Sequence, residues 1–320
     1  MRLPNITLLI LLIILIVPNI SYGAWIWTPE TGSWINPKSA VKDTASEQFS
    51  WAMGFYETTD YKKAITEFRK LVNYYPNAKQ ASKAQYYIGR SYEDLKEFYH
   101  AYIAYQRVME AYPYAENRDE IINRQYDIGM LFFKGEKARL LGVAVLPATD
   151  KAIEIFDQVI KNSPYGEYAD KAQFRIGEAY KNNSAYPEAM LAFQALVEEY
   201  PRSELLSEAN YQIAECAYLA SLGASYDQGS TDIAIEKFKG FVEEHRDDTF
   251  SENAKNTLTK LKEKKAQNVY ETAQFYEKVG RISSAAIYYK ELVDNYPDTS
   301  LAKTSLARLM EIEKIIETRR

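Results

Sequence analysis

The chain repeats a pattern of helix, stop and helix at a nearly fixed spacing. In residues 68–92, apolar and aromatic residues at helical spacing lead to Pro76, and a second helical pattern follows it. Proline cannot continue a helix and biases the residue before it toward an extended conformation. Pro76 and Pro113 are 37 residues apart, as are Pro164 and Pro201. A fixed period of about 20 to 50 residues indicates a chain built from stacked repeats.

Small and large residues alternate at matching positions of each repeat. Small residues are expected where two helices approach within about 8 to 10 Å, and large ones where the space between them must be filled. The first helix of each repeat carries the small residue Ala52, Gly89, Gly129, Gly177, Ala214 or Ala273. The second helix carries an alanine, which is Ala64, Ala101, Ala152, Ala189, Ala234 or Ala285, and an aromatic four residues later, which is Phe68, Tyr105, Phe156, Phe193, Phe238 or Tyr289. The sequence therefore predicts an all-α fold of about six helical hairpins.

This pattern resembles the tetratricopeptide repeat, which places small, aromatic, alanine, aromatic and proline residues at these offsets. The resemblance covers most of residues 47–298 and implies a right-handed solenoid. Residues 299–320 follow with apolar side chains such as Leu306, Leu309 and Ile312 on one helical face. We expect this last segment to be a capping helix, because the end of a stack needs a polar outer surface.

The N-terminal residues precede the repeats. Residues 1–23 have the positive start, apolar core and small residues before the cleavage point that are typical of a secretory signal peptide. The alternative is a membrane anchor, although the apolar run is about half of the ~20 residues that a spanning helix needs. Residues 24–46 are predicted to form a tryptophan-rich strap and linker over the first repeat. The alternative for Trp25, Trp27 and Trp34 is a place at a membrane interface.

Two repeats are longer than the others between their first and second helices. The extra residues lie near 134–150 and near 219–230. A solenoid can extend a loop at these places without disturbing its stack. The apolar segment 140–146 contacts a partner, lengthens a helix or folds back on the core.

Charge and residue pattern argue against nucleic-acid binding, metal binding and catalysis. The formal net charge is −5, whereas nucleic acid requires a basic surface. The two histidines, His100 and His245, are far apart and lack partners at metal-ligand spacing. The single cysteine, Cys216, is predicted to be a small buried residue. We find no phosphate-binding loop or nucleophile motif, and we expect no enzyme activity, no catalytic residue, no metal site and no cofactor.

A row of aromatic residues is the candidate binding site. In tetratricopeptide folds, the residue three positions before the small residue usually faces the concave groove. Here that residue is Phe49, Tyr86, Tyr126, Phe174, Tyr211 or Tyr270, and Arg90, Glu93 and Lys181 lie nearby. Tyrosine offers a large rigid face with a polar tip, so the row is predicted to bind extended peptide or a segment of another protein. The alternative is that these rings are core residues between successive helices.

The last third of the chain resembles the BamD family of outer-membrane assembly lipoproteins. The resemblance rests on 226–238, 270–276, 285–287 and the Tyr-Pro-Asp-Thr segment 296–299, and it extends over roughly residues 45–315. It implies a non-enzymatic periplasmic scaffold of the machinery that folds β-barrel proteins into the outer membrane. The implied partners are a BamA-like barrel protein at the C-terminal repeats and nascent outer-membrane proteins at the N-terminal repeats.

The family's lipid-bearing cysteine is not matched, because Ala24 follows the predicted signal peptide. The expected localisation is therefore the periplasmic side of the outer membrane, with peripheral association. A second interpretation is a periplasmic adaptor resembling YbgF that acts with Tol and cell-division proteins, although a coiled coil before the repeats is not seen. A third, an envelope enzyme such as a peptidoglycan hydrolase, is disfavoured by the missing catalytic pattern.

The alignment of small residues predicts the effect of enlarging them. Replacing Ala64 or Ala101 by leucine should overpack a hairpin and lower the free energy of unfolding by roughly 1 to 3 kcal/mol. Thermal unfolding of Ala64→Leu and Ala101→Leu would measure this, and unchanged melting curves for both would contradict the alignment.

Overall fold

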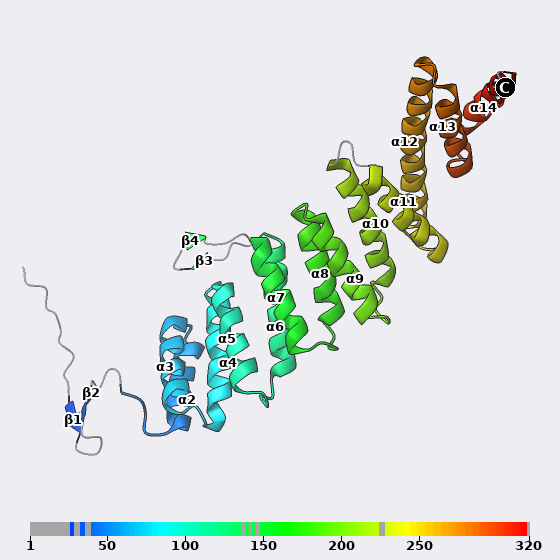
Figure 1. Ribbon diagram of the computed structural model, residues 1–320. Coiled ribbons are helices and arrows are strands. Elements are labelled where there is room, and N and C mark those ends of the chain that lie inside the picture. Colours follow the sequence, from blue (N-terminus) through cyan, green and yellow to red (C-terminus); the bar gives the residue numbers. More distant parts are fainter. Residues whose placement is uncertain are drawn as a thin grey trace, which may run out of the picture. The chain divides into compact units, whose positions relative to one another are not determined.

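The computed structural model describes residues 26–28, 33–35, 40–135, 139–140, 143–144, 148–223 and 228–318. Within these residues, helices α2 to α14 follow one another as helical hairpins, most of them joined by short turns (Figure 1). The predicted all-α fold of helical hairpins is confirmed, whereas its right-handed twist remains a prediction. The chain divides into two compact units, which are residues 1–96 with 110–113 and residues 97–109 with 114–320.

The first unit contains a short β-hairpin and three helices. Thr44 begins α2 by accepting a hydrogen bond from the Glu47 N–H at 3.2 Å, and Asp60 begins α3 by accepting one from the Lys63 N–H at 3.4 Å. In the hairpin, Trp27 lies directly opposite Trp34. The elements are β1 (Ile26–Thr28), β2 (Ser33–Ile35), α2 (Ala45–Glu57), α3 (Tyr61–Tyr74) and α4 (Lys79–Asp94).

Most of the helices belong to the second unit, and most of them pair as α6 with α7, α8 with α9, α10 with α11 and α12 with α13. Each second helix that has a predicted proline stop ends two residues before that proline, as α9 does at Glu199 before Pro201. The helices are α5 (Phe98–Ala111), α6 (Arg118–Phe133), α7 (Ala148–Asn162), α8 (Ala169–Asn182), α9 (Tyr186–Glu199), α10 (Leu206–Gly223), α11 (Gln228–Glu244), α12 (Ser251–Lys278), α13 (Ile282–Asn295) and α14 (Ala302–Thr318).

The predicted second-helix positions form the core. Every alanine of the series is completely buried, and every aromatic four residues later is at most 1% exposed. The alanines are Ala64, Ala101, Ala152, Ala189, Ala234 and Ala285, and the aromatics are Phe68, Tyr105, Phe156, Phe193, Phe238 and Tyr289. The register predicted for all six second helices is therefore the one observed.

Two glycines show why the first helix needs a small residue. A Cβ atom on Gly129 would lie 2.7 Å from Phe156, and one on Gly177 would lie 2.6 Å from Phe193. Both distances are shorter than van der Waals contact, and both rings are fully buried. The ring on the second helix thus fills the space that a Cβ atom on the first helix would need.

The turns between the two helices of a repeat use a left-handed backbone residue. Thr59, Lys96 and Ser184 have φ values near +60°, although they are not glycine, and Gly135 and Gly280 occupy the equivalent place with φ of 98° and 76°. A residue in this conformation ends a helix by letting the backbone turn back on its last carbonyls. The same sharp reversal therefore recurs with different sequences.

The lengthened regions take different forms. The region near 134–150 contains a second β-hairpin, β3 (Arg139–Leu140) paired with β4 (Val143–Ala144), so the described residues include two short hairpins in an otherwise helical chain. Near 219–230, the extra residues lengthen α10 and α11.

The C-terminal elements differ in part from expectation. Helix α12 is continuous over 28 residues, and it packs against α11 near Leu261 and against α13 near Ala273. In α14, Leu309 and Ile312 are buried as predicted, but Leu306 is 46% exposed. The prediction that Leu306 lies on the packed face was therefore wrong. The side of α14 that contacts α13 is narrower than the row of apolar residues along this helix.

The predicted signal peptide, residues 1–23, lies outside the described residues. No helix in the described part of the chain has both the length and the apolar character needed to cross a bilayer.

The close contact of Gly177 with Phe193 and the open space beside Gly240 predict opposite effects of replacing each glycine by alanine. In Gly177→Ala the methyl group collides with Phe193, and overpacking of about 1 to 3 kcal/mol should outweigh the helix-propensity gain of about 1 kcal/mol. In Gly240→Ala no atom lies within 4 Å of the new methyl group, so only the gain in helix propensity remains. Urea denaturation should show a lower midpoint for Gly177→Ala and a higher one for Gly240→Ala. Shifts in the same direction would contradict this packing.

Candidate functional site

The six predicted groove aromatics lie on the first helices and are half-buried or buried. Five of them contact the buried aromatic of their own repeat. The ring-centroid distances are 5.6 Å for Phe49 and Phe68, 5.5 Å for Tyr126 and Phe156, 5.2 Å for Phe174 and Phe193, 6.1 Å for Tyr211 and Phe238, and 5.8 Å for Tyr270 and Tyr289. The sixth, Tyr86, is 7% exposed. These rings thus contribute to packing, and their role in binding remains a prediction.

In the first unit, polar side chains border these rings on α2 and α4. The Tyr56 hydroxyl donates a hydrogen bond to Asp94 Oδ2 at 3.0 Å, which joins α2 to α4. Burial raises the pKa of Tyr56 to about 12, the positive charge of Arg90 opposes this, and the hydrogen bond to Asp94 raises it further. Arg90 donates to the Tyr86 hydroxyl at 3.1 Å. Tyr56 therefore stays a neutral hydrogen-bonding group at physiological pH.

In the second unit, charged side chains form a similar border along α6, α8 and α10. Arg175 pairs with Glu178 on α8, and its guanidinium lies 5.9 Å from the ring centroid of Phe133 on α6. Lys181 on α8 donates to Gln212 Oε1 at 2.6 Å and pairs with Glu215 on α10. The first helices of successive repeats are therefore linked by polar contacts that run beside the aromatic row.

The same kind of link joins the first helix of the last repeat, α12, to the final helix, α14. Arg308 on α14 pairs with Glu277 on α12 and with Glu311 on its own helix. The buried Tyr289 hydroxyl donates to the other oxygen of Glu277 at 3.0 Å. Hydrogen bonding from Arg308, and to a smaller extent from Tyr289, lowers the pKa of Glu277 against the opposing effect of desolvation.

We name the six groove aromatics and the polar side chains beside them on the first helices the first-helix face. It combines aromatic edges with charges that are largely paired within the protein. A peptide binding there would stack on half-buried rings and exchange hydrogen bonds with tyrosine hydroxyls, lysines and glutamates. In the described part of the chain, no group of three or more histidine, cysteine or acidic residues is placed to hold a metal ion. This arrangement is suited to recognising another chain.

The structure adds a polar position that was missed in the sequence. The residue just before the groove aromatic is a buried or half-buried glutamine in four repeats, namely Gln48, Gln85, Gln125 and Gln173. Gln48 donates to the Glu67 carbonyl at 2.9 Å, and Gln173 donates to the Ala192 carbonyl at 2.8 Å, each 19 residues along the chain. The recurring pair of glutamine and aromatic was the signal that could have identified it.

In the third repeat, this glutamine belongs to a cluster of side-chain amides. Gln125 on α6 donates to Gln106 Oε1 on α5 at 3.1 Å, and Asn162 on α7 donates to both glutamines at 2.9 Å. An unsatisfied buried amide is costly, so each of the three helices fixes the position of the others.

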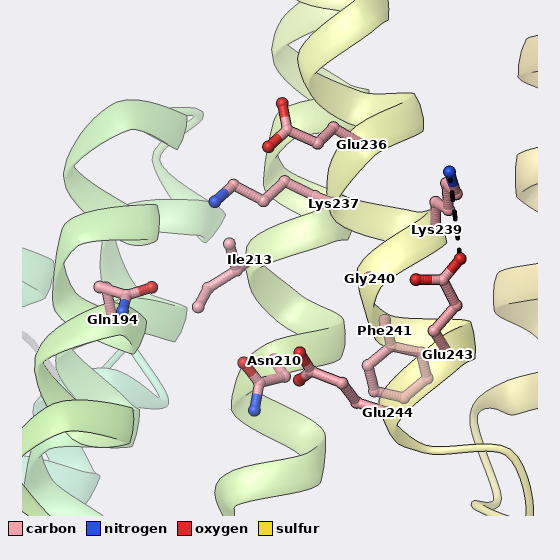
Figure 2. Close-up of a pocket in the computed structure, with 10 residues that line it drawn as sticks. All are labelled: Gln194, Asn210, Ile213, Glu236, Lys237, Lys239, Gly240, Phe241, Glu243 and Glu244. Atoms are coloured by element: carbon pink, nitrogen blue, oxygen red, sulfur yellow. Dashed lines mark ion pairs between the residues drawn. The ribbon is translucent and has the colours of Figure 1, made fainter.

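A hollow of about 370 Å³ lies elsewhere, between α9, α10 and α11 (Figure 2). Its walls include Glu236, Glu244 and Lys237, which extends toward α9, while Lys239 forms a 4.0 Å ion pair with Glu243. The nearly balanced charges favour neither an anion nor a cation.

Cys216 is completely buried, as predicted from the sequence. Burial raises the pKa of its thiol to about 11, and the nearby charge of Lys181 opposes this only partly. A thiol that is both inaccessible and protonated is a packing group and not a nucleophile.

The link from Glu277 to Arg308 predicts a pH-dependent contribution to stability. Because the folded-state pKa of Glu277 is lowered, the contribution is present above the unfolded pKa of about 4.3 and is lost as pH falls through the folded pKa. Both side chains of this ion pair are partly exposed, which limits its contribution to stability. Arg308→Met should therefore lower the free energy of unfolding by about 0.5 to 1 kcal/mol at neutral pH. Urea denaturation across the acid range should show this difference shrinking.

Lys290→Met is the matched control, because Lys290 forms a 3.2 Å pair with Asp294 and both side chains are more than half exposed. It should change stability little at any pH. An effect of Arg308→Met that is the same at neutral and acid pH would contradict the role of this ion pair.

Comparison with known proteins places the chain in a family. The model of the YfiO family, described as outer membrane lipoprotein, matches residues 147–319, and the tetratricopeptide-repeat model matches residues 48–78 and 83–113. The outer membrane protein assembly factor BamD of Caulobacter vibrioides is 22% identical over 162 residues, which are 51% of this chain and 53% of that protein. This chain thus spans about half the length of the curated relative that it matches.

Among solved structures, YrrB, a tetratricopeptide-repeat protein with an unusual peptide-binding site, is 17% identical with a TM-score of 0.34. That match covers 69% of this chain and 94% of YrrB. The type IV pilus biogenesis factor PilW is 14% identical with a TM-score of 0.30, and its match covers 83% of this chain and all of PilW. The family match spans more than half of the residues, and this chain belongs to the YfiO, or BamD, family.

Proposed function

We propose that this protein is a non-enzymatic scaffold on the periplasmic side of the outer membrane, in the machinery that assembles β-barrel proteins there. The observation that carries the proposal is the family match over residues 147–319, which spans α7 to α14 almost completely. The matched relative is named as an outer membrane protein assembly factor. The proposed partners are a BamA-like barrel protein and unfolded barrel substrates.

The first-helix face supports a scaffold that binds extended segments of other proteins. Its rings are fixed by contacts to the core, and its charges are held in pairs, so little side-chain entropy is lost when a partner binds. By position along the chain, the end near Phe49, Tyr86 and Tyr126 is assigned to substrate. The end near Tyr270 is assigned to the BamA-like partner.

Association with the membrane is proposed to be peripheral and to depend on partner contacts. The cysteine of this sequence, Cys216, is buried on α10 in the core cluster that also holds Phe193, and a lipid on its sulfur would disrupt that cluster. Protein contacts on the repeats are the source of attachment that the helices offer.

Affinity capture with residues 24–320 tests the proposed function. The immobilised chain is incubated with a detergent-solubilised envelope of its source organism, and bound proteins are identified by mass. We expect a large β-barrel protein with periplasmic domains. Recovery of Tol or cell-division proteins without any barrel protein would contradict the proposal and favour the adaptor role.

A charge exchange between α8 and α10 tests the role of the face separately. Lys181→Glu should weaken stability, because Glu215 would face a like charge. Adding Glu215→Lys restores an opposite pair with reversed polarity and should recover the melting temperature. If a partner binds to these charges, the double variant should still capture less of that partner than the original chain does. Equal capture by the stable double variant and the original chain would remove this part of the face from the binding site.

A further inference from the structure

In α4, α8 and α10, the side of the first helix that faces the preceding repeat is largely buried within the stack. It is formed by the residues eight, five and one positions before the small residue. In α8 these are Ala169, Ala172 and Ile176, and none is more than 8% exposed. In α10, Ala209 and Ile213 pack in one cluster with Phe193 of the preceding helix α9. These positions therefore form the interface between successive repeats.

In the first repeat, the equivalent side of α2 is open. Its residues are Thr44, Glu47 and Trp51, all of which are exposed. Trp51 is 47% exposed, whereas the equivalent residues Ile88 and Ile128 are at most 3% exposed. A tryptophan is the largest apolar side chain, and leaving half of it in water at an uncovered repeat end is unfavourable.

The open side has the form of a shallow hollow of about 490 Å³. Lys42, Ser46, Glu47, Ser50 and Trp51 line it, and the Lys42 ammonium lies 4.3 Å from the Trp51 ring centroid. We name Thr44, Glu47, Ser50 and Trp51 the end face. It offers one large ring bordered by polar and charged side chains, which suits a flat apolar partner with a polar rim.

The chain itself carries such a partner just before α2. The hairpin of β1 and β2 pairs Trp27 with Trp34 in its register, and we name the side of the hairpin that carries the Trp27 side chain its tryptophan side. Trp27 is 49% exposed. An isolated two-stranded hairpin is at best marginally stable in water and needs a surface to pack against.

Six residues, 36–41, separate the hairpin from Lys42, and Lys42 is held beside the end face by hydrogen bonds. The Lys42 N–H donates to Gln48 Oε1 at 2.9 Å, and the Lys42 carbonyl accepts from the Tyr75 hydroxyl at 2.7 Å. These bonds fix the chain where it leaves the hollow. The residues between Ile35 and Lys42 reach at most about 25 Å, so the hairpin stays at high effective concentration near Trp51.

We propose that the tryptophan side of the β1–β2 hairpin docks on the end face over Trp51 and closes the first repeat. The hairpin then takes the place that a preceding repeat has elsewhere in the stack. Phe49 and Tyr56 lie on other sides of α2, where they contact Phe68, Tyr87 and Asp94. Docking thus covers the end of the stack and leaves the first-helix face accessible.

Tryptophan fluorescence tests this directly, because all four tryptophans of the chain lie between residues 25 and 51. Trp51→Phe and Trp51→Glu leave the same three tryptophans as reporters. In residues 24–320 with Trp51→Phe, the end face stays apolar, so emission should be blue-shifted and poorly quenched by acrylamide. With Trp51→Glu, a charge replaces the apolar surface, so emission should shift to the red and quenching should rise severalfold.

Two further variants control for indirect effects. Phe275→Glu puts the same charge on an aromatic that is 60% exposed on α12, and it should leave quenching unchanged. Ser50→Arg fills the hollow and blocks docking without replacing any tryptophan. It should therefore raise acrylamide quenching as Trp51→Glu does. Equal quenching of Trp51→Phe and Trp51→Glu, both with native circular dichroism, would overturn the proposal.

Other occupants of the tryptophan side give different results. If the hairpin lies at a membrane, Trp51→Phe would be fully quenchable in buffer and would shift to the blue on adding phosphatidylethanolamine and phosphatidylglycerol vesicles. If a second copy covers it, quenching would fall as protein concentration rises. Either result would overturn docking within one chain, whereas emission that is blue-shifted and independent of both vesicles and concentration supports it.

Discussion

The close approach of the two helices in each hairpin is the constraint on which the rest of the structure depends. A fully buried ring on the second helix, such as Phe193, lies where a Cβ atom on Gly177 would be. The ring cannot move out without leaving a cavity, and the first helix cannot carry a larger side chain without being pushed away. This contact sets the spacing in each hairpin, and its recurrence gives each repeat the same register.

That contact also limits what the first-helix face can offer a partner. The groove aromatics lie one turn from the small residue, so most of them rest on the buried ring of their own repeat, as Tyr126 rests on Phe156. They are rigid for the same reason that they are only partly accessible. Specificity then depends more on the polar side chains beside them, and ion pairs such as that of Lys181 with Glu215 join neighbouring first helices. Stability and recognition therefore share residues along this face.

The two ends of the chain meet the same physical problem in different ways. A stack of repeats exposes at each end a surface that is covered elsewhere. At the C-terminus, α14 covers the last hairpin with Leu309 and Ile312 and is held by the ion pair of Arg308 with Glu277. At the N-terminus, Trp51 stands where the next four repeats have a buried isoleucine. Docking of the tryptophan hairpin would give that end an equivalent cover.

The sequence by itself determined the helical hairpins, their register and the buried series, because proline stops and small residues act locally or through one neighbouring helix. It also identified the family resemblance, and Cys216 as a packing residue. Tertiary structure alone decided which groove aromatics rest on core rings, that Gln48 and Gln173 bond to carbonyls 19 residues away, and that Leu306 is exposed. Each of these depends on the rotation of one helix against the next, and helical periodicity does not specify that rotation. A side chain's place on its own helix can be counted along the chain, but the group it meets is fixed only when the helices pack.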